Sequence, residues 1–314
     1  MENKRKLLLI VLVLSLFTLL FFRLFFPKPA VSPLKKESGE KEYFPSLPPQ
    51  RTIVLRAVGD VMLGRMVNVK MLENNDFKYP FLKTAELLST ADLTFGNLES
   101  PIIDNCKTTK TGMVFCGRKE SIEGLFFAGF DIVSIANNHI LNQGREGRKQ
   151  TIKLLSEKNI LASDSENLAI VNVNGVSFGF LSFDLTVTNN PEPLVKKVKE
   201  SVSKADLVIV SLHWGAEYLK EPFPWQKELG RKLIDEGVKV VIGHHPHVTQ
   251  PTEEYKDGLI FYSLGNFVFD QMWSEETKKG QIAEIFFEEK QIKSYKTIPI
   301  YITDYCQPVL GSSR

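Results

Sequence analysis

This sequence has few cysteines and a net charge close to zero. Only three of its 314 residues are cysteines, and no Cys-x-x-Cys pair occurs. This scarcity excludes a disulfide-scaffold fold, a zinc ribbon and a thioredoxin-like redox site. Net charge is only +2. Most of the excess of basic over acidic residues lies near the N-terminus. Composition therefore gives no reason to expect nucleic-acid binding, and no nucleic-acid partner is expected.

A long apolar run lies at the N-terminus. Lys4-Arg5-Lys6 precede it, and from Leu7 to Phe26 only Arg23 is charged. About 20 apolar residues span a bilayer, and a basic cluster before them predicts a cytoplasmic N-terminus. We expect residues 1–26 to be a cytoplasmic tip followed by one transmembrane helix. A cleaved signal peptide and a buried soluble helix are the alternatives. The first two readings place residues 50–314 outside the cytoplasm.

Residues 27–49 hold six of the sixteen prolines, interleaved with charged residues. Such a composition favours an extended spacer over a packed core. We therefore expect a linker at 27–49 and a folded domain at 50–314.

Cys106 and Cys116 flank a short polar loop. In an oxidising compartment they are expected to form a disulfide, and two reduced thiols are the alternative. Cys306 is left over and is expected to be buried or free.

Short apolar runs alternate with segments of helical periodicity over the rest of the chain. Strands are expected at 53–58, 92–95, 131–136, 207–212 and 238–242, with runs at 259–264 and 281–287 closing the set. Helices are expected at 82–88, 121–128, 146–158, 192–204 and 225–236. Asn174-Gly175 between two apolar runs predicts a β-hairpin. This alternation predicts an α/β class with mixed sheets.

Polar residues of metal-ligand type follow five of the predicted strands. The runs are Gly59-Asp60, Gly96-Asn97-Leu98-Glu99, Asn137-Asn138-His139, His213-Trp214-Gly215 and Gly243-His244-His245-Pro246-His247. All five histidines of the chain lie in these runs. Ligands of open α/β sheets bind outside the carboxyl ends of strands, where sequence-distant residues converge. Imidazole, carboxylate and amide groups together suit zinc, manganese or iron. The pattern predicts a metal or polyanion site.

These runs resemble the CapA family of capsule and poly-γ-glutamate synthesis proteins, within the calcineurin-like metallophosphoesterase superfamily. The resemblance spans about residues 53–270. The matching runs are Ala57 to Arg65, Asn97 to Pro101, Ala136 to His139, Leu212 to Tyr218, Gly243 to Val248 and Tyr262 to Phe269.

The resemblance implies a metallophosphoesterase-like α/β/β/α sandwich with mixed sheets and a site at the sheet edge. By resemblance, Asp60 and His247 bind a first metal and Glu99 bridges two metals. The second metal is bound by Asn138, His213 and His245, and His139, beside Asn138, is the catalytic acid or transition-state stabiliser. His244 lies next to the matching pair without being required by it, and we weigh a solvent-facing or substrate-side role for it equally with a ligand role. Arg65 and Glu217 are candidates for contacts with substrate or with the ligands.

One departure from the family pattern concerns the first motif. The superfamily has Asp-x-His there, whereas this chain has Asp60, Val61 and Met62. The first metal would keep three protein ligands, which leaves either an open position for water or a weak site. The resemblance therefore implies one or two divalent ions.

Three functions are compatible with these observations. The first is a membrane-anchored, metal-dependent hydrolase of cell-envelope polymer or phosphoester. The second is a non-catalytic accessory subunit that binds anionic polymer and other capsule-synthesis membrane subunits. The third is an extracytoplasmic domain with a vestigial site. The poly-γ-glutamate connection is implied by the resemblance alone.

Overall fold

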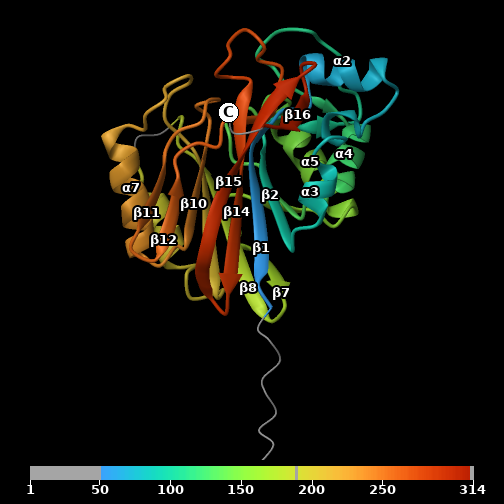
Figure 1. Cartoon of the computed structure of the whole chain (residues 1–314). Helices are drawn as coiled ribbons and strands as arrows, with labels where there is room; N and C mark the ends of the chain where they lie inside the picture. Colours follow the sequence, from blue (N-terminus) through green and yellow to red (C-terminus); the bar gives the residue numbers. More distant parts are fainter. Residues whose placement is uncertain (1–50, 188–189, 312–314) are drawn as a thin grey trace, which may run out of the picture. The chain divides into compact units, whose positions relative to one another are not determined.

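Two β-sheets lie at the centre of this computed structural model, which describes residues 51–187 and 190–311 (Figure 1). The first sheet has the order β16-β15-β14-β1-β2-β5-β6, and β13 pairs with the end of β1. Its strands are β1 (Ile53–Val61), β2 (Leu93–Leu98), β5 (Ile132–Ser134), β6 (Leu161–Ser163), β13 (Asn266–Val268), β14 (Lys279–Glu288), β15 (Gln291–Thr303) and β16 (Gln307–Leu310). Because β1 pairs parallel with β2 and antiparallel with β14, the predicted mixed sheet is confirmed.

The second sheet has the order β11-β12-β10-β9-β8-β7. Its strands are β7 (Ala169–Val173), β8 (Val176–Asp184), β9 (Leu207–His213), β10 (Val240–His244), β11 (Thr252–Tyr255) and β12 (Gly258–Phe261). The predicted hairpin is confirmed, since β7 and β8 pair antiparallel around Asn174 and Gly175. Both turn residues have positive φ, 50° and 84°, as a tight hairpin turn of this type requires. A small separate sheet pairs β3 (Ile102–Ile103) with β4 (Gly117–Arg118).

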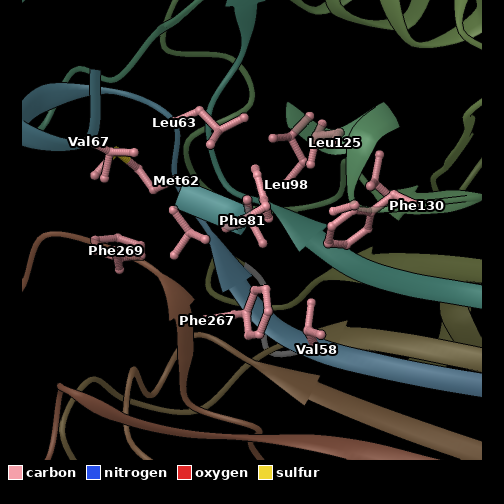
Figure 2. Packing of buried hydrophobic residues seen from close by; sticks show 14 of the residues in the cluster. Val58, Met62, Leu63, Val67, Phe81, Leu98, Leu125, Phe130, Phe267 and Phe269 are labelled. Atoms are coloured by element: carbon pink, nitrogen blue, oxygen red, sulfur yellow. The ribbon is translucent and has the colours of Figure 1, made fainter. Parts of the chain in front are cut away.

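Helices cover the outer faces of both sheets. They are α2 (Arg65–Glu73), α3 (Ala85–Ser89), α4 (Ile122–Phe127), α5 (Gly144–Glu157), α6 (Glu192–Lys199) and α7 (Pro224–Asp235), with short 3₁₀ helices η1 (Tyr79–Phe81) and η2 (Lys119–Ser121). One hydrophobic core lies between the first sheet and helices α2, α3, α4 and α5 (Figure 2). A second core lies between the sheets, and a third joins the second sheet to α6 and α7.

Strand periodicity explains these layers. Leu207 and Ile209 of β9 face the core between the sheets, whereas Val208 and Val210 face the helices. Successive side chains of a strand point to opposite faces, so a strand with apolar residues at every position is buried on both sides. The order of layers is therefore helix, sheet, sheet, helix, as the family resemblance implies.

The sequence analysis was wrong about where the set of strands ends. It closed the set at 281–287, but β15 and β16 follow, and β13 and α2 were also not expected. In β15 every position before Ile300 is exposed or half-buried, and up to Thr297 its apolar residues stand singly between polar ones. β15 is held instead by its antiparallel ladder with β14, which a local pattern does not reveal.

The cysteines behave as expected. Cys106 and Cys116 form a disulfide, and Cys306 is free and buried. The expected membrane anchor at 1–26 and the linker at 27–49 lie outside the described residues. Within the described part of the chain, no helix combines the length and hydrophobicity that crossing a bilayer demands.

Candidate metal centre

The predicted site residues converge at one edge, where strands of both sheets end. Asp60 of β1 lies beside Asn97 of β2 in parallel register, and His213 of β9 lies beside His244 of β10 in the same way. Parallel strands bring their carboxyl ends to one edge, so the residues that follow them meet there. Strands β1 and β2 run slightly further than expected, and Asp60 and Asn97 are their penultimate residues.

Glu99 is the centre of the cluster. Its side chain is fully buried, and its Oε1 atom has no hydrogen-bond partner. Three imidazole Nε2 atoms surround this oxygen, at 3.6 Å for His247, 3.9 Å for His139 and 4.0 Å for His213. These separations are too long for hydrogen bonds but lie within about twice a metal–ligand bond of about 2.1 Å. The gap therefore fits a cation better than it fits a hydrogen-bond network.

Several neighbouring residues contact the Asp60 carboxylate. Asn97 donates its Nδ2–H to Oδ1 at 2.9 Å, and the backbone N–H of His245 donates to Oδ2 at 3.3 Å. His247 Nδ1 lies 3.2 Å from the same Oδ2. One ligand atom from each of Asp60, Glu99 and His247 lies within 4.8 Å of the others, and all three residues are buried. This is the group that the resemblance implies for the first metal.

The group implied for the second metal is also assembled. His213 Nε2 lies 3.0 Å from Asn138 Oδ1, and the His213 and His245 rings are 4.8 Å apart. His245 is 8% exposed and its Nδ1 has no partner. The structure thus brings all seven predicted site residues together. Their roles as ligands stay predictions.

Left-handed backbone conformations turn several of these side chains toward the site. His245 and His247 have φ values of 95° and 58°, and Arg65 and Tyr218 at the border of the site have 45° and 66°. Such conformations cost about 1–3 kcal/mol each for residues other than glycine and are concentrated at functional sites.

His139 is held by a neighbour that the sequence analysis did not single out. Asn142 Oδ1 lies 3.0 Å from His139 Nδ1 and accepts the backbone N–H of Phe115 at 2.7 Å. The Phe115 ring stacks on the imidazole with centroids 4.0 Å apart. Cys116 follows Phe115, so the disulfide anchors the segment that covers His139. In the sequence, only the spacing of three residues between His139 and Asn142 indicated that their side chains could meet.

Burial and mutual charge set the protonation of the cluster. Burial raises the pKa of Asp60, but interactions with His244 and His247 outweigh it and hold that pKa well below its usual range. Burial, together with the charges of Asp60 and Glu217, raises the pKa of Glu99 well above its usual range. Burial lowers the pKa of His213 and of His245, which keeps both imidazoles neutral. Neutral imidazole is the form that binds metals.

His247 is the exception among the histidines. Burial lowers its pKa, but the Glu99 charge and Asp60 raise it to about 9. A proton on His247 therefore neutralises part of the carboxylate charge in the metal-free cluster. A divalent cation supplies the same compensation, so these donors fit a metal.

The solvent-facing or substrate-side alternative for His244 was wrong. Its side chain is fully buried, with Nδ1 3.1 Å from Asp60 Oδ1, so it neither faces solvent nor lines the substrate side. The reason is its position as the last residue of β10, beside His213, where the side chain enters the space between the sheets near Phe95.

Met62 contributes no side-chain atom to the cluster. It is fully buried in the core between the first sheet and its helices (Figure 2), and its sulfur accepts the backbone N–H of Gly64 at 3.0 Å. The chain leaves the sheet after Val61, so position 62 belongs to the hydrophobic core.

A cleft of about 440 Å³ opens beside the cluster. His139, His247 and Glu217 line its inner part, and exposed Tyr218 and Trp273 line its outer part with their rings at a right angle. Arg65 also lines the cleft, but Asp270 binds its guanidinium, with 3.1 Å between Nε and Oδ2. Cluster and cleft together provide a buried polar centre with an open approach.

The sandwich of two mixed sheets has counterparts among solved structures. A solved structure titled as a novel phosphatase from Mycoplasma pneumoniae superposes with a TM-score of 0.55 at 16% identity. The match covers 80% of this chain and 94% of that chain, and it shows the fold alone.

Sequence relatives identify the family. Residues 54–271 match the family described as bacterial capsule synthesis protein PGA_cap, and the chain belongs to this family. The capsule biosynthesis protein CapA of Bacillus anthracis is 31% identical over 304 residues, covering 88% of this chain and 71% of that protein. The PGA biosynthesis protein CapA of Bacillus subtilis strain 168 is 31% identical over 269 residues, covering 78% and 70%. The resemblance to the CapA family is confirmed.

Proposed function

We propose that this protein is a membrane-anchored, extracytoplasmic capsule biosynthesis protein and a metal-dependent hydrolase of cell-envelope polymer or phosphoester. The observation that carries the hydrolase proposal is Glu99 Oε1, buried without a hydrogen bond and surrounded by three imidazole Nε2 atoms. His139 lies between this centre and the cleft, where a substrate would enter.

The location outside the cytoplasm has separate support. The Cys106–Cys116 disulfide is typical of oxidising compartments. The apolar run at 7–26 with basic residues before it supports a single anchor with its N-terminus in the cytoplasm. An anionic envelope polymer and other capsule-synthesis subunits of the membrane are the partners we propose.

The residues divide the chemistry among themselves. A divalent ion bound by Asp60, Glu99, His247 or by Asn138, His213, His245 would lower the pKa of a water molecule and polarise the scissile bond. Asn142 holds His139 Nδ1, which leaves Nε2 directed at the centre. Because its Nδ1–H is donated to the Asn142 oxygen, His139 in its imidazolium form would give the Nε2 proton to the leaving group while water adds across the broken bond.

Hydrolysis by the full chain, loaded with Mn²⁺, tests this proposal. The probes are bis(4-nitrophenyl) phosphate and poly-γ-glutamate. His139→Ala is expected to lower the rate at least 100-fold with bound metal unchanged, since general acid catalysis typically contributes 10²–10⁴-fold. Chelation is expected to abolish it. An activity indifferent to both changes contradicts the proposal.

A second candidate is the non-catalytic accessory subunit. The position of Met62 in the hydrophobic core favours it, because the first metal loses a ligand of the superfamily pattern. This alternative predicts that His139→Ala leaves capsule output unchanged in cells, whereas deletion of residues 1–26 abolishes output. Loss of output from His139→Ala with normal protein levels favours the hydrolase.

A further inference from the structure

We propose that Glu217 is a metal ligand, which supplies a carboxylate oxygen beside His245 and His247 at the metal centre. The inference rests on the metal centre of the proposed function and adds a ligand to it. One ligand atom from each of Glu217, His245 and His247 lies within 4.8 Å of the others. His247 also belongs to the group with Asp60 and Glu99, so the two groups share a residue.

The loop after β9 holds Glu217 against the two histidines. The backbone N–H of Trp214 donates to the His244 carbonyl at 3.1 Å, and that of Tyr218 donates to the Pro246 carbonyl at 2.7 Å. Gly215 has φ 85°, and a Cβ there would meet the Gln226 amide at 2.9 Å, so the loop takes a path that favours glycine. The position of Glu217 is therefore set by backbone contacts with the histidine segment itself.

Unsatisfied groups at the same place indicate a missing cation. His245 Nδ1 and Glu99 Oε1 both lack partners, and their side chains are more than nine-tenths buried. Glu217 is half-buried and lines the inner cleft. Among the described residues no lysine or arginine forms an ion pair with Glu217, so no ammonium or guanidinium group occupies its carboxylate.

Carboxylate oxygen is a suitable substitute for imidazole at such a centre. Zinc and manganese both accept carboxylate ligands, and manganese favours them. Met62 is fixed in the core and contributes no donor, whereas Glu217 adds a carboxylate from the opposite sheet without any change in β1. A carboxylate beside the two imidazoles should favour manganese over zinc.

The experiment measures metal binding by the full chain in detergent, without any substrate. Wild type, Glu217→Gln and the matched control Glu221→Gln, an exposed glutamate in the same loop, are stripped of metal and titrated with Mn²⁺ by calorimetry. Bound metal is then counted by elemental mass spectrometry. We expect Glu217→Gln to lose one equivalent or to weaken binding at least tenfold, and Glu221→Gln to match wild type. Loss of even an outer-shell partner costs 10–100-fold.

The outcomes separate this inference from the proposed function. Equal binding by wild type and Glu217→Gln overturns the ligand role and leaves the metal centre intact. No binding by wild type overturns the centre and the inference together. Metal-free melting temperatures of the three proteins should coincide, and Glu217→Asp, which keeps the carboxylate, should bind better than Glu217→Gln. A loss of binding that accompanies a lower metal-free melting temperature and is not improved in Glu217→Asp counts against the proposal.

Discussion

The backbone conformation at single residues determines which side chains place metal-binding atoms at the strand ends. Met62 has the sequence position of a metal ligand, yet its side chain is part of the hydrophobic core. Asn142 and Glu217 have no such position in a motif of ligands, yet they lie beside His139 and His245. The side chain of a residue that follows a strand is directed by the local path of the backbone, which a motif does not specify.

Met62→His is predicted not to add a metal ligand. The new imidazole would be buried among apolar side chains, which costs about 1–3 kcal/mol for a polar group without partners. We expect a lower free energy of unfolding in urea and unchanged bound metal. Met62→Leu, of similar volume, should cost less than about 1.5 kcal/mol. An additional equivalent of metal in Met62→His would show that position 62 reaches the site.

The sequence predicted the candidate site better at strand ends than in loops. Asp60, Asn138 and His213 were found because apolar runs end there and because the family motifs fall on them. Glu217 was left open between several roles, since a loop with left-handed residues such as Tyr218 places side chains by backbone turns that periodicity does not encode.

At the scale of elements, the buried central strands were predicted and the strands at the side of the first sheet were not. Strands β9 and β10 are buried on both faces and read as continuous apolar runs. Helix α2 has no side-chain cap and no acidic residue in its first turn, so nothing in its sequence indicated where it begins. It is held by Val67 and Met71, which pack into the first core.

A buried ion pair between β1 and β14 is predicted to make stability depend on pH. Arg56 Nε donates to Glu284 Oε1 at 2.7 Å, and Lys296 lies 2.7 Å from Oε2. Burial raises the pKa of Glu284, but Lys296 and Arg56 outweigh burial and lower it below its ordinary value of 4.5. The pair therefore stabilises the fold above pH 4.5, and this contribution is lost as pH falls through the lowered folded pKa.

Glu284→Gln tests the pair. We expect it to cost about 2 kcal/mol at pH 7, in line with hydrogen bonds to charged groups, and to reduce the slope of stability against pH in acid. Urea unfolding between pH 3 and pH 7 measures both. Glu288→Gln, on the same strand with its own lysine partner Lys293, is the control and should change stability by less than about 1 kcal/mol. Equal slopes for wild type and Glu284→Gln would contradict the assignment.

Removal of the disulfide is predicted to lower stability and to loosen the cover of His139. The bond closes a loop with a sequence separation of 10, for which the chain-entropy model gives about 2–3 kcal/mol. We expect the double substitution Cys106→Ser and Cys116→Ser to lower the free energy of unfolding by that amount. Limited proteolysis should then cut within 107–115 faster. Unchanged cleavage there would show that Phe115 and Asn142 hold the loop without the bond.

At the scale of the whole molecule, the candidate site is divided between the two sheets. Asp60, Glu99 and Asn138 lie at or just after the ends of strands of the first sheet, whereas His213 and His245 lie at or just after the ends of strands of the second. An ion bound by both sets joins the sheets at one end of the sandwich. The hairpin between β7 and β8 lies at the other end, because β8 runs parallel to β9 (Figure 1).

Metal binding is therefore predicted to stabilise one end of the molecule selectively. Mn²⁺ at 100 times its dissociation constant should raise the free energy of unfolding by about 2.7 kcal/mol through mass action. Hydrogen exchange should slow at 60–62, 97–99 and 244–247, with the 173–176 turn unchanged. Uniform slowing would mean that the ion acts on the global equilibrium alone, and no slowing would mean that these residues hold no ion.

The order of synthesis gives the divided site a consequence for quality control. Asp60 and Glu99 are made early, and His247 comes almost 150 residues after Glu99. Strand β14, which closes the first sheet against β1, is made later still. A chain truncated before residue 247 has Asp60 and Glu99 without the His247 imidazole that completes their group. Metal retention would then distinguish finished molecules from fragments, independently of any reaction at the site.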